Sequence, residues 1–245
     1  DKAYYFITVN NTDGKRIAQK TENTVSSAST ITVFDDYIFH EKEEKNLLAV
    51  GTQWFFGEDF NVQNTQDFNI SFPNAVANED INIRVRGVSN SVTSSSMDVK
   101  INGQDLFAIN YPSVNPSSLT RAYAVEKNGT FVNNSENIAI SITYNNNGNP
   151  SASAFLDYIE IVGKKQLKFT DFQFSFRSFE QVNTTGALSY QIENGSAAFQ
   201  VWDVTNPTSP EIITNQSTAN NFTFQDSTGT LREYIILEES DFYRP

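Results

Sequence analysis

The 245-residue chain contains no cysteine and one histidine, His40. The missing cysteine excludes a thiol nucleophile, a disulfide framework and any thiolate metal site within these residues. A single histidine excludes zinc sites built from several histidines, and a Ser-His-Asp triad would have to use it. The charged segment FHEKEEKN around His40 indicates a solvated loop, so we interpret His40 as a surface residue. We therefore predict that this chain is not itself an enzyme and holds no cofactor or metal.

Basic residues and long hydrophobic runs are also scarce. Lys and Arg number 17 against 29 Asp and Glu, which gives a net charge of −12. Nucleic acids and anionic membranes need clustered basic residues, so this balance argues against both as partners. No run reaches the length of a transmembrane helix, and the first residues, DKAYYFITV, indicate a strand rather than a signal peptide.

What the sequence does contain is strand patterning from end to end. The segment DINIRVRGV alternates Ile81, Ile83 and Val85 with polar residues, which is typical of a half-buried strand. Asn102-Gly103 lies between two apolar runs and predicts a tight hairpin. Further strands are expected at AYYFITV, TITVF, FNISF, LTRAYAV, NIAISITY, AFLDYIEIVG, ALSYQIEN, AFQVWDV, EIIT, NFTF and LREYIIL. With no amphipathic helix among them, the chain is predicted to be all-β.

The basic segment GKKQLKF, residues 163–169, is the best candidate for an internal boundary. It follows a strong strand pattern and precedes a series of shorter apolar segments. We predict a jelly-roll or galactose-binding-like antiparallel sandwich over residues 1–163. A small immunoglobulin-like sandwich is expected over residues 164–245.

The segment GTQWFFGEDF, residues 51–60, raises the question of a binding site because it joins three aromatic rings to two carboxylates. Side chains alternate along a strand, so Trp54 and Phe56 would share one face and Phe55 the other. We predict that Trp54 and Phe56 are core residues and that Phe55 is partly exposed against another domain. The acidic pair Glu58-Asp59 is expected to be solvated.

The order and spacing of several motifs resemble the region that precedes the peptidase domain in type IX secretion system sortases. These are surface proteins of Bacteroidetes with a gingipain-type cysteine peptidase domain. The matching positions are His40-Glu41, Gly51, Trp54, Gly57-Glu58, the segment Trp202 to Pro207 and the terminal Tyr243-Arg244-Pro245.

The resemblance implies a parent protein that removes C-terminal sorting domains from secreted cargo and attaches the cargo to lipopolysaccharide at the cell surface, in association with the outer membrane. The family's catalytic residues belong to the peptidase domain, so none is carried over to this chain. The expected partners are that downstream domain, the outer-membrane attachment complex and the cargo. The interface residues that we predict are Phe55, Trp202, Phe242 and Tyr243.

Two other classes of function remain open from the residues alone. Jelly rolls with exposed aromatic rings bind sugars, and FLDYIEI is similar to the last strand of carbohydrate-binding modules. An aspartate such as Asp157 often helps hold calcium there, although a calcium site needs oxygens from several segments. The simpler interpretation is a solvent-facing strand aspartate. The other class, an adhesin stalk or scaffold, shares the same composition.

Overall fold

The structure, a computed structural model, describes residues 6, 8–9, 11–22, 25, 28–49, 51–170 and 172–242. The described residues form sixteen strands, one four-residue α-helix, α1 (Glu180–Asn183), and two short 3₁₀ helices, Gly195–Ala197 and Glu239–Asp241. The predicted all-β fold is confirmed. None of the helices in this part of the chain is long and apolar enough to cross a membrane. The chain divides into two compact units, and we call Thr32–Lys168 the inserted unit and Asp1–Ile31 with Phe169–Pro245 the flanking unit.

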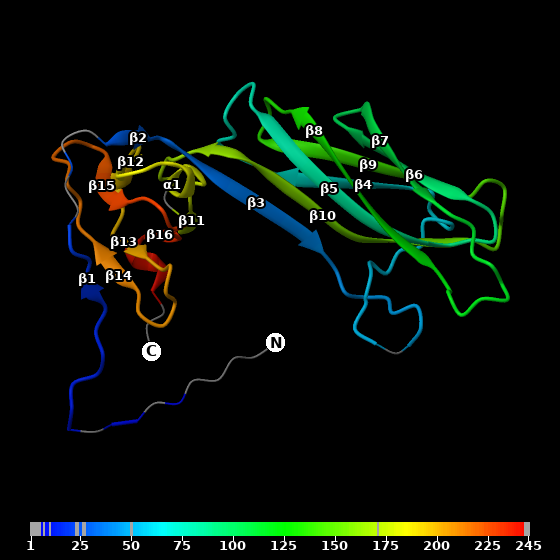
Figure 1. Cartoon of the computed structure of the whole chain (residues 1–245), viewed down its shortest axis with the longest axis horizontal. Helices are drawn as coiled ribbons and strands as arrows, with labels where there is room; N and C mark the ends of the chain where they lie inside the picture. The colour runs from blue at the N-terminus through cyan, green and yellow to red at the C-terminus, as the bar shows by residue number, and fades with distance from the viewer. Residues whose placement is uncertain are drawn as a thin grey trace. The chain divides into compact units, whose positions relative to one another are not determined.

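The inserted unit contains two four-stranded antiparallel sheets (Figure 1). The first sheet has the order β3 (Val33–Glu41), β10 (Ser153–Gln166), β5 (Asp80–Asn90) and β8 (Tyr123–Val132). The second has the order β4 (Thr65–Ser71), β9 (Asn137–Asn145), β6 (Ser95–Ile101) and β7 (Gln104–Tyr111).

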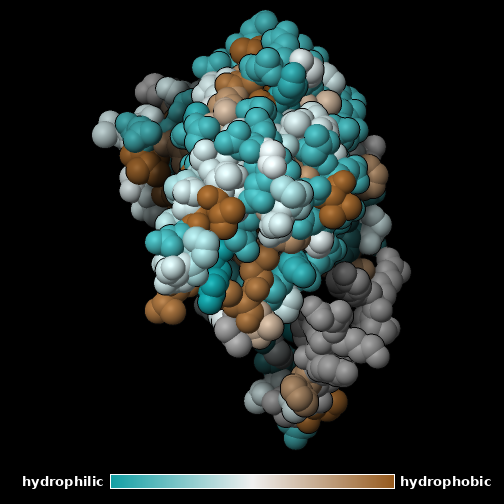
Figure 2. Space-filling model, turned by 90° about the vertical axis from the view of Figure 1, so that its right-hand side faces the viewer, coloured by the Kyte–Doolittle hydropathy of each residue, from teal (hydrophilic) through white to brown (hydrophobic). Residues whose placement is uncertain are grey.

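The alternation seen in the sequence places one apolar face of each sheet in a shared core. Ile81, Ile83 and Val85 of β5 are at most 2% exposed, and Ile138 and Ile140 of β9 pack into the same cluster. The hairpin between β6 and β7 turns at Asn102 and Gly103, whose φ angles of 50° and 81° explain the Asn-Gly pair. Figure 2 shows small, separated hydrophobic patches among hydrophilic residues on one outer face of the molecule.

The flanking unit contains a five-stranded and a three-stranded sheet. The larger has the order β1 (Ala18–Gln19), β14 (Glu211–Ile213), β13 (Gln200–Asp203), β16 (Tyr234–Leu237) and β11 (Phe174–Phe176). The smaller has the order β15 (Phe222–Ser227), β12 (Ala187–Ile192) and β2 (Ser29–Ile31). Aromatic rings from both sheets fill the core of the flanking unit. Tyr190 stacks on Phe224 at 4.9 Å between ring centroids, and Phe176 stacks on Tyr234 at 5.2 Å.

The division into units differs from the predicted 1–163 and 164–245. Strands β1 and β2 pair in parallel with β14 and β12, so the contacts group residues 1–31 with the C-terminal segments. The basic segment after residue 163 is no linker either, because β10 runs on to Gln166. Its cations are neutralised from β3: Lys164 lies 3.2 Å from Asp35, and Lys165 lies 2.7 Å from Asp36. The predicted strand AYYFITV falls mostly outside the described residues.

Candidate functional site

The outer face of the five-stranded sheet carries a row of side chains that crosses all five strands. Trp202 on β13 is opposite Ile212 on one side and Ile235 on the other, with Gln19 and Ser175 at the ends of the row. The neighbouring residues Val201 and Ile236 are fully buried, so alternation directs this row outward. Trp202, Ile212 and Ile235 are half-buried, which leaves a continuous apolar strip on the sheet.

Two further rings extend this strip. Phe242 lies 5.9 Å from Trp202 and 5.4 Å from Phe199, edge to face in both pairs. Phe199 is 50% exposed and Phe242 is 37% exposed. We call the set Phe199, Trp202, Ile212, Ile235 and Phe242 the C-terminal surface. The indole N–H of Trp202 donates to Gln200 Oε1 at 2.8 Å, so its polar atom is satisfied while the ring stays partly open.

The structure thus brings together two of the four residues predicted at an interface, Trp202 and Phe242. Tyr243 lies outside the described residues. Sequence reasoning missed Phe199, Ile212 and Ile235. Alternation in EIIT and EYIIL could have shown that one isoleucine of each segment faces outward, but not that both flank Trp202, because the strand order is not written in the sequence.

On the inner side of β13, Asp203 belongs to a charge cluster that the sequence did not indicate. The Lys20 ammonium group lies between the carboxylates of Asp203 and Asp226 and makes an ion pair with each. The side chains of the three residues are 15%, 5% and 4% exposed, respectively. Arg232 adds contacts of 3.3 Å to Asp203 and 3.4 Å to Asp226. This cluster fastens the segment after β1 to strands β13 and β15.

Hydrogen bonds extend the cluster into the aromatic core. Tyr234 donates its hydroxyl to Asp226 at 2.8 Å, Gln181 donates to Tyr234 at 3.0 Å, and Tyr190 donates to Gln181 at 3.0 Å. Burial raises the pKa of both tyrosines, so the phenols stay protonated and act as donors. These hydrogen bonds connect the charge cluster to the aromatic core and hold the side chains of both in fixed positions.

The segment GTQWFFGEDF corrects the prediction made from alternation. Trp54 is 40% exposed, whereas Phe55 is 3% and Phe56 is 5% exposed. The predicted burial of Phe56 is confirmed, and the predicted burial of Trp54 and exposure of Phe55 are wrong. Phe55 packs with Val88 and Phe155 in a small cluster, and Phe56 joins the main core.

The physical reason is that this segment is an irregular loop rather than a strand. Phe55 forms an isolated bridge with Lys45, and the N–H of the next residue, Phe56, bonds instead to the carbonyl of Leu156 at 2.9 Å. The acidic pair divides as well. Glu58 is exposed, but Asp59 is half-buried and accepts hydrogen bonds from the N–H groups of Asn61 and Ala154.

His40 lies on β3 rather than in a solvated loop, which corrects the prediction for FHEKEEKN. Its ring is 5.3 Å from Phe56 and 5.8 Å from Phe68, and it is half-buried. Burial lowers the pKa of His40, and the positive charge of Lys42 lowers it further. The imidazole therefore serves as a packing group on the inner side of β3.

This depressed pKa predicts an acid-sensitive contribution to stability. The unfolded chain binds a proton at His40 near the ordinary pKa of 6.5, whereas the folded chain resists it. Stability is therefore lost as the pH falls below that value. Because His40 is the sole histidine, His40→Gln should lose less in melting temperature than the parent between pH 7.5 and 5.5 (about two units around that pKa). Equal losses in thermal unfolding scans would contradict the assignment.

Asp157 does not face solvent, which corrects the simpler interpretation of this residue. It lies at the β-bulge where the register between β10 and β5 shifts, and it is 5% exposed. Its carboxylate makes an ion pair with Arg86. Burial raises the pKa of Asp157, and Arg86 partly offsets this effect. Among the described residues, no group of three or more acidic or histidine side chains is arranged to hold a metal ion.

No family model and no curated protein sequence matches the chain. Among solved structures, dimeric latent PorU from Porphyromonas gingivalis matches with a TM-score of 0.77 and 15% identity, over 94% of this chain and 22% of that one. A CBM36-1 domain of a multidomain xylanase from the hindgut metagenome of Trinervitermes trinervoides matches with a TM-score of 0.31 and 16% identity, over 51% of this chain and 96% of the module. At these identities the comparisons describe fold. The chain therefore shares the fold of a region that makes up 22% of PorU.

Proposed function

We propose that this chain is the non-catalytic β region of a cell-surface type IX secretion system sortase. The observation that carries the proposal is the match to PorU, which covers 94% of the chain at a TM-score of 0.77 and so includes both units. The motif order from His40-Glu41 to Tyr243-Arg244-Pro245 supports it independently, because it depends on the sequence and not on the fold.

In this proposal the whole protein is a cysteine endopeptidase. It removes C-terminal sorting domains from cargo and attaches the cargo to lipopolysaccharide at the outer membrane. The present chain does not supply the cysteine nucleophile of such an enzyme, since it has no cysteine. Its role is to position the peptidase domain and to contact attachment-complex partners and cargo.

The C-terminal surface is the proposed contact with the peptidase domain. It exposes Phe199 and Phe242 beside the half-buried Trp202, and Phe242 is three residues from position 245. A domain that continues the chain would start beside these rings. Contacts between domains of one chain typically bury about 600–1,500 Å². An apolar strip that crosses a sheet is suited to such an interface.

Hydrogen exchange tests this proposal on the full-length protein against residues 1–245. Amides of β13, β16 and Phe242 should exchange more slowly in the full-length protein, because the peptidase domain covers the C-terminal surface. Phe199→Ser with Phe242→Ser in the full-length protein should restore the faster exchange. Leu119→Ser, which changes a 95% exposed apolar side chain in the inserted unit, is the matched control.

Equal exchange in the two forms would mean that the domains share a chain without docking, and the positioning role would fall. A reading frame that lacks an α/β domain with cysteine and histidine beyond residue 245 would remove the sortase assignment itself.

A further inference from the structure

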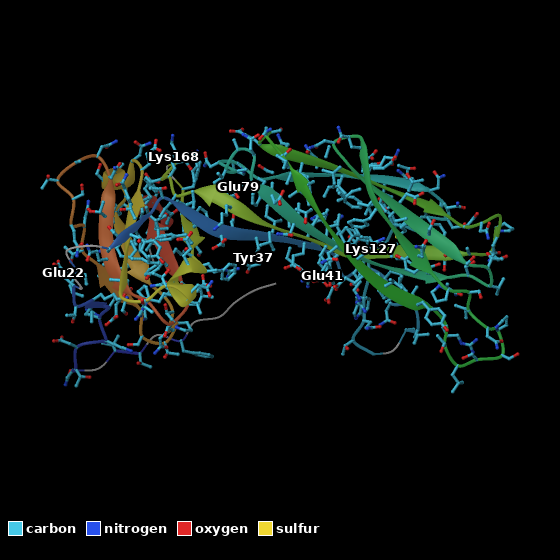
Figure 3. All side chains as sticks on the ribbon, turned by 45° about the horizontal axis from the view of Figure 1, so that its top comes forward. Glu22, Tyr37, Glu41, Glu79, Lys127 and Lys168 are labelled. Carbon is cyan, nitrogen blue, oxygen red and sulfur yellow. The ribbon has the colours of Figure 1, made fainter. Side chains whose placement is uncertain are left out.

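The outer face of the sheet formed by β3, β10, β5 and β8 gathers aromatic and charged side chains in register. Tyr158 on β10 is opposite Glu41 on β3 and Arg86 on β5, and Glu160 is opposite Phe39 and Arg84. Tyr37 lies two residues before Phe39 on β3, and it projects from the same side of that strand as Glu41 (Figure 3). We call Tyr37, Phe39, Arg84, Glu126, Tyr158 and Glu160 the platform.

The aromatic part of the platform is open to solvent. Phe39 is 47% exposed and Tyr37 is 51% exposed, although both lie on a regular nine-residue strand. The ring of Phe39 lies 4.8 Å from that of Tyr158 with an interplanar angle of 35°. Tyr37 is about 7 Å from Phe39 along the strand, because a strand advances by about 3.4 Å per residue and the two positions differ by two. The rings therefore form an extended surface rather than a pocket.

The polar part of the platform is held in place beside the rings. Arg84 contacts Glu160 at 3.3 Å and Glu126 at 3.6 Å, and the Tyr158 hydroxyl donates to Glu126. The side chains of Arg84 and Glu126 are 48% and 44% exposed. Their mutual contacts restrict their rotamers. Binding of a ligand to these side chains therefore costs less side-chain entropy than binding to side chains that move freely.

The charges on this face favour a neutral ligand with many hydroxyl groups. Arg84 is already shared between two carboxylates, and the chain as a whole carries −12, so an anionic ligand gains no free cation here and is repelled at long range. The carboxylates are engaged by Arg84 and Tyr158, which reduces their attraction for a cation. A sugar hydroxyl can donate to Glu126 or Glu160 and accept from Arg84, while the C–H face of the pyranose packs on an aromatic ring.

We propose that the platform binds a neutral polysaccharide chain laid across β3 and β10. Phe39 and Tyr158 provide the stacking surface, Tyr37 extends it to a neighbouring sugar, and Arg84 with the two glutamates orients the hydroxyl groups. This site shares no residue with the C-terminal surface and does not depend on the sortase assignment.

Affinity electrophoresis of residues 1–245 in native gels tests the proposal. The gels contain mixed-linkage β-glucan, xylan or galactomannan as neutral probes, with polygalacturonate and polylysine as charged comparators. At least one neutral polysaccharide should retard the chain. Phe39→Ala should weaken that affinity about tenfold, the scale of one lost aromatic contact. Phe39→Tyr should retain binding, and Arg84→Gln should reduce it. Thermal unfolding of each variant confirms that it is folded.

Trp54→Ala is the matched control, because it removes another partly exposed ring, 40% exposed, from outside the platform. Its retardation should equal that of the parent chain. The proposal is overturned if no neutral polysaccharide retards the chain, or if only polygalacturonate or polylysine does. It is also overturned if Trp54→Ala abolishes retardation while Phe39→Ala leaves it intact, since the sugar would then bind elsewhere.

Discussion

Lys20→Met should lower the free energy of unfolding of the flanking unit by about 3 kcal/mol, at the lower end of the range for breaking a buried ion pair. The ammonium group of Lys20 pairs with Asp203 and Asp226, both almost fully buried. Removing it leaves two carboxylates close to one remaining cation, Arg232. An uncompensated buried charge is far more costly than the loss of the pair itself, and this asymmetry sets the size of the effect.

Urea unfolding followed by fluorescence measures the change. Lys15→Met is the matched control, because Lys15 is an exposed lysine of the same N-terminal segment whose ammonium group donates to the carbonyl of Thr208 at 2.9 Å. It should change stability by less than about 0.5 kcal/mol, as surface substitutions do. Equal effects of the two variants would show that the segment after β1 contributes through its backbone pairing alone.

The difference in stability between the parent chain and Lys20→Met should also depend on pH. Burial alone would raise the pKa of Asp203, but hydrogen bonds from Lys20 and Thr205 outweigh it and hold the pKa below its ordinary value of 3.8. Such a carboxylate stabilises the fold above its unfolded pKa, and this contribution is lost as the pH falls through the lower folded value. Without Lys20 the pKa of Asp203 rises, so the stability difference between parent and variant should narrow toward acid pH.

The distance between Lys20 and its partners along the chain explains why the sequence did not reveal this cluster. Lys20 is 183 positions from Asp203 and 206 positions from Asp226 in the sequence. Local patterning predicts strands such as DINIRVRGV and the turn at Asn102-Gly103, because each depends on neighbouring residues alone. It does not predict that β1 and β2 pair with strands from the far end of the chain.

The C-terminal surface also shows that strand order cannot be predicted from local sequence patterns. The sequence predicts Trp202 and Phe242 as interface residues, and the structure places their rings 5.9 Å apart. Ile212 and Ile235 join them because β14 and β16 flank β13, which is a fact of strand order. Sequence could therefore predict two anchors of the surface but not its extent.

Phe56→Ala should lower the free energy of unfolding of the inserted unit by about 3–5 kcal/mol, because it removes a buried aromatic ring and leaves a cavity in the core. The ring is 5% exposed and packs edge to face on Phe68 at 6.0 Å, with His40 at 5.3 Å. Trp54→Ala, two residues earlier, should cost less than about 1 kcal/mol, since its ring is 40% exposed.

Thermal unfolding of the two variants side by side compares burial and residue size directly. If side-chain volume decided the outcome, the tryptophan variant would be the less stable. Because burial decides it, the phenylalanine variant should melt at the lower temperature, by several degrees for each kcal/mol in a unit of this size. The reverse order would return Trp54 to the core and restore the alternating strand that the sequence predicts. With Trp54 at the surface, the segment from Gly51 to Trp54 instead leads into a loop in which Phe55 packs with Val88 and Phe155 while Phe56 joins the main core.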